Sequence, residues 1–194
     1  MQASRKIHRW KILGSKLAFR HRWYKLRRDS VEIRPGEILN DYFLGIFNNA
    51  VHIVALTNNN KIIMVRQYKH GAGKILFEVP AGYLHKKEAP LAAAKRELLE
   101  ETGYAAKKWR RLGFFYSNPT CEKGNGTYIF LAEGAILVGK QNLDITEAIE
   151  VYLFSQDEVI RRITSNKMKV SPSTLALLLG LLKKRKLRIH STRS

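Results

Sequence analysis

The sequence is poor in the features that mark secreted and membrane proteins. It has a single cysteine, Cys121, so no disulfide can form within the chain. Its apolar run near the end, residues 175–182, is far shorter than the ~20 residues that span a bilayer. No apolar signal-peptide core is present. We therefore predict a cytoplasmic protein that does not enter a membrane.

Linkers, repeats and low-complexity tracts are also missing. No stretch rich in Gly, Ser or Pro divides the 194 residues, of which 45% are hydrophobic, enough for a sizeable core. We predict a single compact unit with two parts. The first is a basic β-rich extension over residues 1–47, and the second is the main domain over residues 48–194.

Acidic residues are scarce, and none precedes Asp29. The chain carries 35 Lys and Arg against 16 Asp and Glu, a formal net charge of +19, which attracts polyanions. Trp10 and Phe19 lie among the early cations, a combination that can bind nucleic acid. Because no recognised nucleic-acid motif accompanies the charge, we favour a basic surface that aids solubility and attracts small anionic substrates.

The pattern of apolar residues predicts an α/β fold with a mixed sheet covered by helices. Runs typical of strands lie at 31–33, 42–47, 51–56, 62–65, 112–116, 128–132 and 149–154. The polar segment 58–60 between two of these runs predicts a hairpin. Helices are predicted from about 89 to 102, over 156–163 and over 171–186.

The first of these helices concentrates carboxylates. Pro90 suits its first turn and Gly103 its end. Positions three and four apart share a helix face, which groups Glu97, Glu100 and Glu101. A separate apolar stripe is expected from Leu91, Ala94 and Leu98. Arg96 offsets part of the repulsion among the glutamates, and a hard cation such as Mg²⁺ would offset more.

The segment from Gly82 to Tyr104 resembles the Nudix box. That pattern is Gly, five residues, Glu, seven residues, then Arg-Glu-apolar-any-Glu-Glu-any-Gly-apolar. The chain fills its fixed positions with Gly82, Glu88, Arg96, Glu97, Glu100, Glu101 and Gly103. Tyr104 stands where a branched aliphatic residue is usual. The resemblance implies a Nudix-type α/β/α sandwich and a hydrolase that acts on phosphorus-containing anhydrides.

The resemblance also implies the roles of the box residues. The metal, Mg²⁺ with Mn²⁺ as a substitute, is held by the Ala81 carbonyl and by the carboxylates of Glu97, Glu100 and Glu101. Glu88 and Arg96 orient these ligands and complete the catalytic group. Glu100 is either a further ligand or a base.

Flanking residues resemble the ADP-ribose pyrophosphatase branch of the family. This resemblance rests on Val65-Arg66-Gln67-Tyr68, Phe77-Glu78-Val79-Pro80-Ala81-Gly82 and Pro119. The usual Ser-Pro-Gly is replaced by Ser117-Asn118-Pro119-Thr120, which weakens the assignment to ADP-ribose itself. The branch hydrolyses nucleoside diphosphate sugars to a nucleoside monophosphate and a sugar phosphate. Arg66, Glu78 and Pro119 are its expected substrate contacts.

The general base stays open at this point. Relatives often draw it from the loop before the last strand, where Glu147 is the best match in this chain. Some place a glutamate where Ile145 stands here. The candidates are therefore Glu100, Glu147, Glu122 and Asp144.

The branch commonly forms homodimers in which N-terminal strands complete the partner's pocket, so the resemblance implies a homodimer through residues 1–47. Two other functions are compatible with the fold. One is a Nudix hydrolase of RNA 5′ ends or dinucleoside polyphosphates. The other is a non-catalytic Nudix module that binds nucleotides or nucleic acid, although such modules usually lose box carboxylates and none is missing here.

Overall fold

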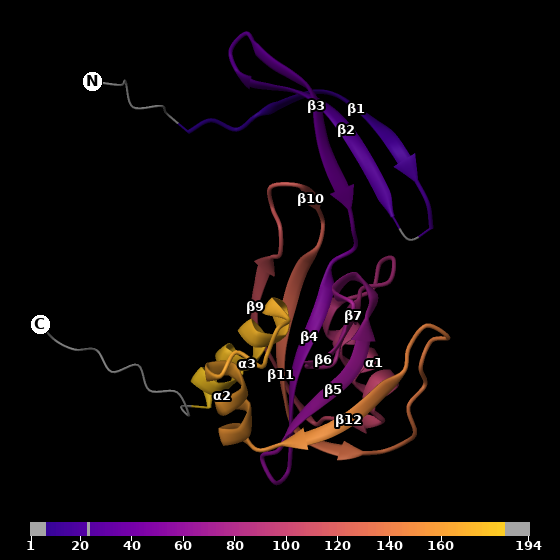
Figure 1. Cartoon of the computed structure of the whole chain (residues 1–194), viewed down its shortest axis with the longest axis vertical. Helices are drawn as coiled ribbons and strands as arrows, with labels where there is room; N and C mark the ends of the chain where they lie inside the picture. The colour runs from indigo at the N-terminus through magenta and orange to yellow at the C-terminus, as the bar shows by residue number, and fades with distance from the viewer. Residues whose placement is uncertain (1–6, 23, 185–194) are drawn as a thin grey trace, which may run out of the picture. The chain divides into compact units, whose positions relative to one another are not determined.

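The computed structural model describes residues 7–22 and 24–184 (Figure 1). Contacts divide the chain into two units, Met1–Asn48 with Asn118–Asn125, and Asn49–Ser117 with Gly126–Ser194. A segment remote in the sequence therefore belongs with the N-terminal strands. The cations at residues 5–6 and beyond residue 184 lie outside the described residues.

The first unit is a small sheet in the order β1-β2-β3-β10. Its strands are β1 (Lys11–Arg20), β2 (Lys25–Arg34), β3 (Glu37–Ile46) and β10 (Glu122–Lys123). The first three are antiparallel, and β10 runs parallel to β3. Every residue of β1 is exposed. Among the described residues of this unit, only Asp29, Val31 and Gly45 are buried.

The two faces of this sheet differ in chemistry. Residues paired across strands share a face. We define the apolar face by Ile12, Leu17, Val31, Leu39, Tyr42 and Leu44, and the basic face by Lys16, Phe19, Leu26, Arg28, Ser30 and Phe43. Arg27 and Asp29 form an ion pair on the apolar face, with 2.5 Å between Nη2 and Oδ2.

The second unit is built on a larger sheet with the main order β12-β5-β4-β11-β8, to which β6, β7 and β9 add. Its strands are β4 (Ala50–Thr57), β5 (Ile62–Lys69), β6 (Lys74–Glu78), β7 (Ala81–Tyr83), β8 (Tyr104–Ala105), β9 (Lys108–Tyr116), β11 (Gly126–Leu137) and β12 (Ile149–Phe154). The pair β4–β11 is parallel, whereas the other pairs are antiparallel. The predicted mixed sheet and the β4–β5 hairpin are thus confirmed.

Helices cover both faces of this sheet (Figure 1). They are α1 (Pro90–Thr102), α2 (Gln156–Thr164) and α3 (Ser171–Lys183), with a short 3₁₀ turn at η1 (His70–Ala72). Alternate residues of β4 face opposite layers: Val51 and Ile53 pack in one cluster with α1, and Val54 and Leu56 pack in another with α2 and α3. This is the predicted α/β/α sandwich.

Two details differ from expectation. The buried stripe of α1 is Ala93, Ala94 and Leu98, whereas Leu91 is exposed, because the helix turns its alanines toward β4. The last helix ends at Lys183, and residues 185–186 of the predicted span lie outside the described residues. No helix in the described part of the chain combines the length and the apolarity needed to cross a membrane.

Candidate active site

Helix α1 is fixed at both ends by its backbone. Ala89 is extended and Pro90 opens the first turn, as its preset φ favours. Gly103 adopts a left-handed conformation, with φ of 74°, and donates its N–H to the Leu99 carbonyl. A Cβ on Gly103 would also lie 2.3 Å from the Gly139 carbonyl oxygen. These constraints hold the carboxylate face of the helix in place.

Strand β7 brings backbone against that face. Ala81 donates its N–H to Glu101 Oε2 at 2.9 Å. A Cβ on Gly82 would lie 2.0 Å from Glu97 Oε1, so any larger residue would force the Glu97 carboxylate to move. The backbone at Gly82 therefore closely approaches a carboxylate of the helix.

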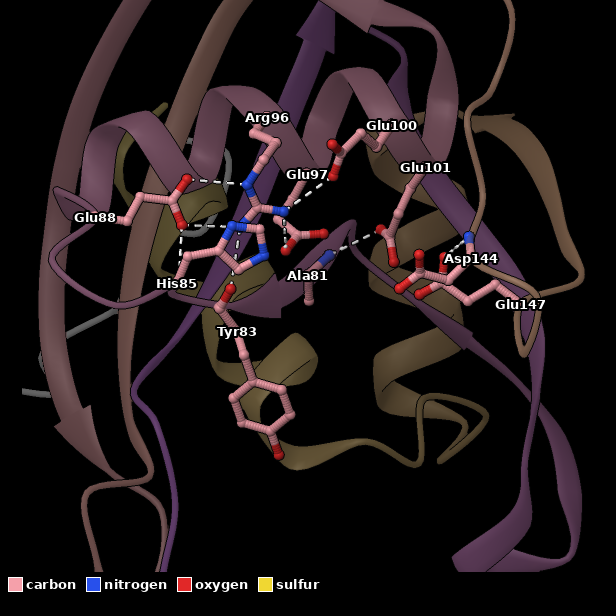
Figure 2. A network of polar contacts seen from close by, with 10 residues as sticks. All are labelled: Ala81, Tyr83, His85, Glu88, Arg96, Glu97, Glu100, Glu101, Asp144 and Glu147. Atoms are coloured by element: carbon pink, nitrogen blue, oxygen red, sulfur yellow. Dashed lines mark hydrogen bonds and ion pairs between the residues drawn. The ribbon is translucent and has the colours of Figure 1, made fainter. Parts of the chain in front are cut away.

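Arg96 joins most of the box carboxylates (Figure 2). Its guanidinium holds both oxygens of Glu88 at 2.9 Å. Its Nη1 donates to Glu97 at 2.7 Å and to Glu100 at 2.9 Å. Nη2 also donates to the Tyr83 carbonyl at 3.0 Å. This bidentate and branching geometry suits arginine and would not suit lysine.

The electrostatics separate the glutamates into two groups. The hydrogen bond from Arg96, with a further one from the His85 N–H, lowers the pKa of Glu88 to about 2. Burial instead raises the pKa of Glu97, and it raises that of Glu101 well above its usual value. Glu101 is only 3% exposed and also feels the charge of Glu97. Added positive charge would therefore be stabilising beside the buried Glu101 and the partly buried Glu97.

The loop before β12 brings a further carboxylate to this pair. The negative charge of Glu147 contributes to the raised pKa of both Glu97 and Glu101. Its Oε2 accepts the Asp144 N–H at 3.1 Å, and its own N–H donates to the Asp144 carbonyl at 2.9 Å. Figure 2 shows this turn beside Glu101. Ile145 is fully exposed.

Two expected substrate residues lie on other strands of the same unit. Arg66 pairs with Glu150 at 3.4 Å and donates to the Tyr152 hydroxyl at 3.3 Å. Glu78 is buried, and its Oε1 lies 3.1 Å from Lys69 Nζ. The structure thus places both in cross-strand pairs and not on the box helix.

The remaining candidates belong to the first unit. Pro119 is exposed, in the turn before β10. Glu122, a candidate base, is part of β10 and accepts a hydrogen bond from Asn125.

Sequence reasoning missed two residues that bear on this site, His52 and Lys69. His52 on β4 pairs with Ala81 in the sheet register, and burial lowers its pKa to about 4. Its Nδ1 makes no hydrogen bond to any described residue. Lys69 carries a charge that acts on His52, Glu78 and Glu101. The sequence does contain a signal for His52, because a histidine interrupts the apolar run 51–56. It contains no signal for Lys69, whose pairing with Glu78 joins two strands.

Known proteins resemble this chain in sequence and in fold. Residues 47–173 match the family described as NUDIX domain. An ADP-ribose pyrophosphatase of Bacillus subtilis (strain 168) is 36% identical over 129 residues, or 66% of this chain and 69% of that protein. A methanol dehydrogenase activator of Bacillus methanolicus is 32% identical over 175 residues, or 89% of this chain and 92% of that protein.

A solved structure described as an ADP compounds hydrolase has a TM-score of 0.81, covering 95% of this chain and 100% of that one. Its sequence identity is 20%, so this likeness concerns the fold alone. The family match covers more than half of the chain and includes the whole carboxylate helix. The chain therefore belongs to the Nudix family of hydrolases.

Proposed function

We propose that the protein hydrolyses the diphosphate of ADP-ribose or a related nucleoside diphosphate sugar in the cytoplasm, giving a nucleoside monophosphate and a sugar phosphate. The observation that carries the proposal is the pair formed by the buried Glu101 and the partly buried Glu97, which lies against Gly82, with further carboxylates nearby. Relatives named ADP-ribose pyrophosphatase, at 36% and 34% identity, support the substrate class.

The carboxylates suit a hard divalent cation, for which Mg²⁺ is the proposed metal and Mn²⁺ a substitute. Within residues 7–22 and 24–184 no group of three or more Asp, Glu, His or Cys side chains forms a preformed cage, since Arg96 engages Glu97 and Glu100. Glu101 is buried, and the charge of Glu97 adds to the rise in its pKa, so these two carboxylates nonetheless fit such an ion. The proposed ligands are the Ala81 carbonyl, Glu97, Glu100 and Glu101.

When bound, the metal neutralises diphosphate oxygens and lowers the pKa of a water. The chain's own residues do the rest. Arg96 holds Glu97 and Glu100, and is itself anchored by Glu88, whose low pKa keeps it ionised. The Ala81 N–H fixes the rotamer of Glu101. These contacts position the ligand oxygens before substrate arrives.

Glu147 is the proposed general base. Glu88, Glu97 and Glu100 each accept a hydrogen bond from Arg96, whereas Glu147 is held only by the backbone of Asp144 among the described contacts. Its carboxylate is therefore available to take a proton from the attacking water as one phosphorus–oxygen bond of the diphosphate breaks. Glu147→Gln should lower kcat with little change in KM, whereas Asp144→Asn should not.

We further propose a homodimer through the apolar face of the first unit. Ile12 and Leu17 on this face are 57% and 50% exposed, and Trp10, just before β1, is 48% exposed; apolar side chains gathered on an exposed surface mark interaction sites. Trp10 packs edge-on against Tyr42, with ring centroids 5.2 Å apart. Leu17→Glu should shift the protein to monomer in sedimentation, and a wild-type monomer at micromolar concentration would contradict the dimer.

A substrate panel tests the activity. Purified protein is assayed with ADP-ribose, other nucleoside diphosphate sugars, dinucleoside polyphosphates and capped RNA, each with Mg²⁺ and with Mn²⁺. We expect the highest kcat/KM for a nucleoside diphosphate sugar. Preference for capped RNA or a dinucleoside polyphosphate would replace the proposed substrate, and no turnover of any compound would indicate a binding module.

A further inference from the structure

The basic face of the first unit carries a row of charge. Lys16 on β1 pairs with Arg28 on β2, which pairs with Phe43 on β3, so the three side chains follow one another across the sheet. Like charges directly opposite each other are destabilising in a sheet. Among the described residues, no carboxylate forms an ion pair with either cation. The row therefore holds two uncompensated positive charges.

The same face is hollowed around this row. The hollow has a volume of about 380 Å³ and is lined by Gly14, Ser15, Lys16, Arg28, Ser30 and Asn40. Arg28 Nε donates to the Asn40 carbonyl at 2.9 Å, and the Ser30 hydroxyl donates to the Asn40 side chain. A Cβ on Gly14 would meet nothing within 4 Å. Arginine, lysine and hydroxyl donors around an open floor match phosphate oxygens.

Aromatic rings flank the cations. Phe43 ends the charged row and is 44% exposed. Phe19 lies in the next row, beside Leu26, and is 54% exposed. Tyr24 packs edge-on against Phe47 over Gly45, whose missing Cβ makes room for both rings. Exposed rings beside cations on a sheet are the arrangement on which unpaired bases stack while the backbone is neutralised.

We propose that the basic face binds single-stranded nucleic acid, with Lys16 and Arg28 on the phosphates and Phe43 and Phe19 against the bases. The net charge of the sequence alone did not favour nucleic-acid binding. The structure adds that the cations and the exposed rings lie beside one another on one face of the sheet. A second copy of the chain is a poor occupant of this face, because a symmetric contact would bring two basic faces, each with Lys16 and Arg28, against each other. The rings likewise have no role toward inorganic polyphosphate.

Binding is measured on the full chain by fluorescence anisotropy with a labelled oligouridine of about 12 nucleotides. We expect the double change Lys16→Gln and Arg28→Gln to weaken binding about tenfold or more, and to reduce the salt slope by about 1.4. The matched control, Lys140→Gln with Lys167→Gln, removes the same charge from exposed positions of the second unit and should change affinity less than about twofold. Equal losses in both double variants would overturn the proposal.

The rings are tested separately. Phe43→Ala should weaken oligouridine binding by about 5-fold to 100-fold, and Phe43→Tyr should retain it, because tyrosine keeps the stacking surface. Circular dichroism checks that each variant is folded. Unchanged binding by Phe43→Ala contradicts the proposal. So does equal or tighter binding of inorganic polyphosphate, or of vesicles rich in phosphatidylserine, when Phe43→Ala leaves that binding intact.

Discussion

The two units are both rich in strands, yet they treat apolar side chains in opposite ways. In the second unit, β4 is buried along almost its whole length between two helical layers. In the first, every residue of β1 is exposed although the strand contains isoleucine, leucine and phenylalanine. An apolar strand therefore does not by itself indicate a core. What decides is whether the chain supplies a second layer to cover it.

The difference extends to charge. The second unit buries glutamates whose pKa is raised by loss of solvent, which is the setting for metal chemistry. The first unit buries Asp29 in an ion pair with the partly buried Arg27, and it displays Lys16 and Arg28 on an open face. The first unit is thus suited to recognition and the second to catalysis. Substitutions matched between the units test this division.

The largest effect is expected at Glu101. Glu101→Gln keeps an acceptor for the Ala81 N–H but removes a proposed ligand, so turnover should fall by about 10² or more. Because the change removes a buried charge without changing volume, the free energy of unfolding should change by less than about 1.5 kcal/mol. Hydrolysis of ADP-ribose and thermal unfolding measure the two quantities. Turnover near the wild-type value would remove Glu101 from the site.

Replacing a leucine with alanine should destabilise the protein far more in the second unit than in the first. Leu98 is fully buried between α1 and the sheet, so Leu98→Ala should cost about 2–5 kcal/mol in urea unfolding. Leu17 is 50% exposed on β1, and Leu17→Ala at concentrations that favour monomer should cost less than about 1 kcal/mol. Comparable costs at the two sites would mean that β1 is covered in solution even without a partner.

Two glycines give a finer test. Gly82→Ala places a methyl group on Glu97 and should cost about 1–3 kcal/mol while also lowering kcat. Gly14→Ala meets open space and should change stability by no more than about 0.5 kcal/mol. Chemical denaturation of the two variants makes the comparison. If Gly82→Ala changed neither stability nor kcat, Glu97 would be free to move, which contradicts its proposed position as a metal ligand.

The features that could be predicted from the sequence are local. Pro90 and Gly103 bound α1 through their own backbone preferences, and the spacing of Glu97 and Glu101 on one helix sets their shared face. The run of apolar residues over 51–56 similarly predicts a strand. Such features depend on neighbours within a few residues, so periodicity is enough to find them.

The features that escaped prediction are pairings between distant segments. β10 joins the first unit through Glu122 beside Gly45, a contact that no nearby residue signals. Arg66 is held by Glu150, more than 80 positions away, because β5 and β12 are neighbours in the sheet. The exposed state of Leu91 follows from how α1 is rotated on β4. Each depends on tertiary packing, which helix and strand periods do not encode.

Exposed ion pairs should show no difference between the units at all. Arg34 with Glu37 in the first unit and Arg66 with Glu150 in the second are both open to solvent, so water and salt screen them alike. Arg34→Gln and Arg66→Gln should each leave the midpoint of thermal unfolding unchanged. If Arg66 contacts substrate, only Arg66→Gln should raise KM, with kcat retained. A loss of stability seen only in Arg66→Gln would instead assign Arg66 a structural role between β5 and β12. Burial alone would then not explain the difference between the two units.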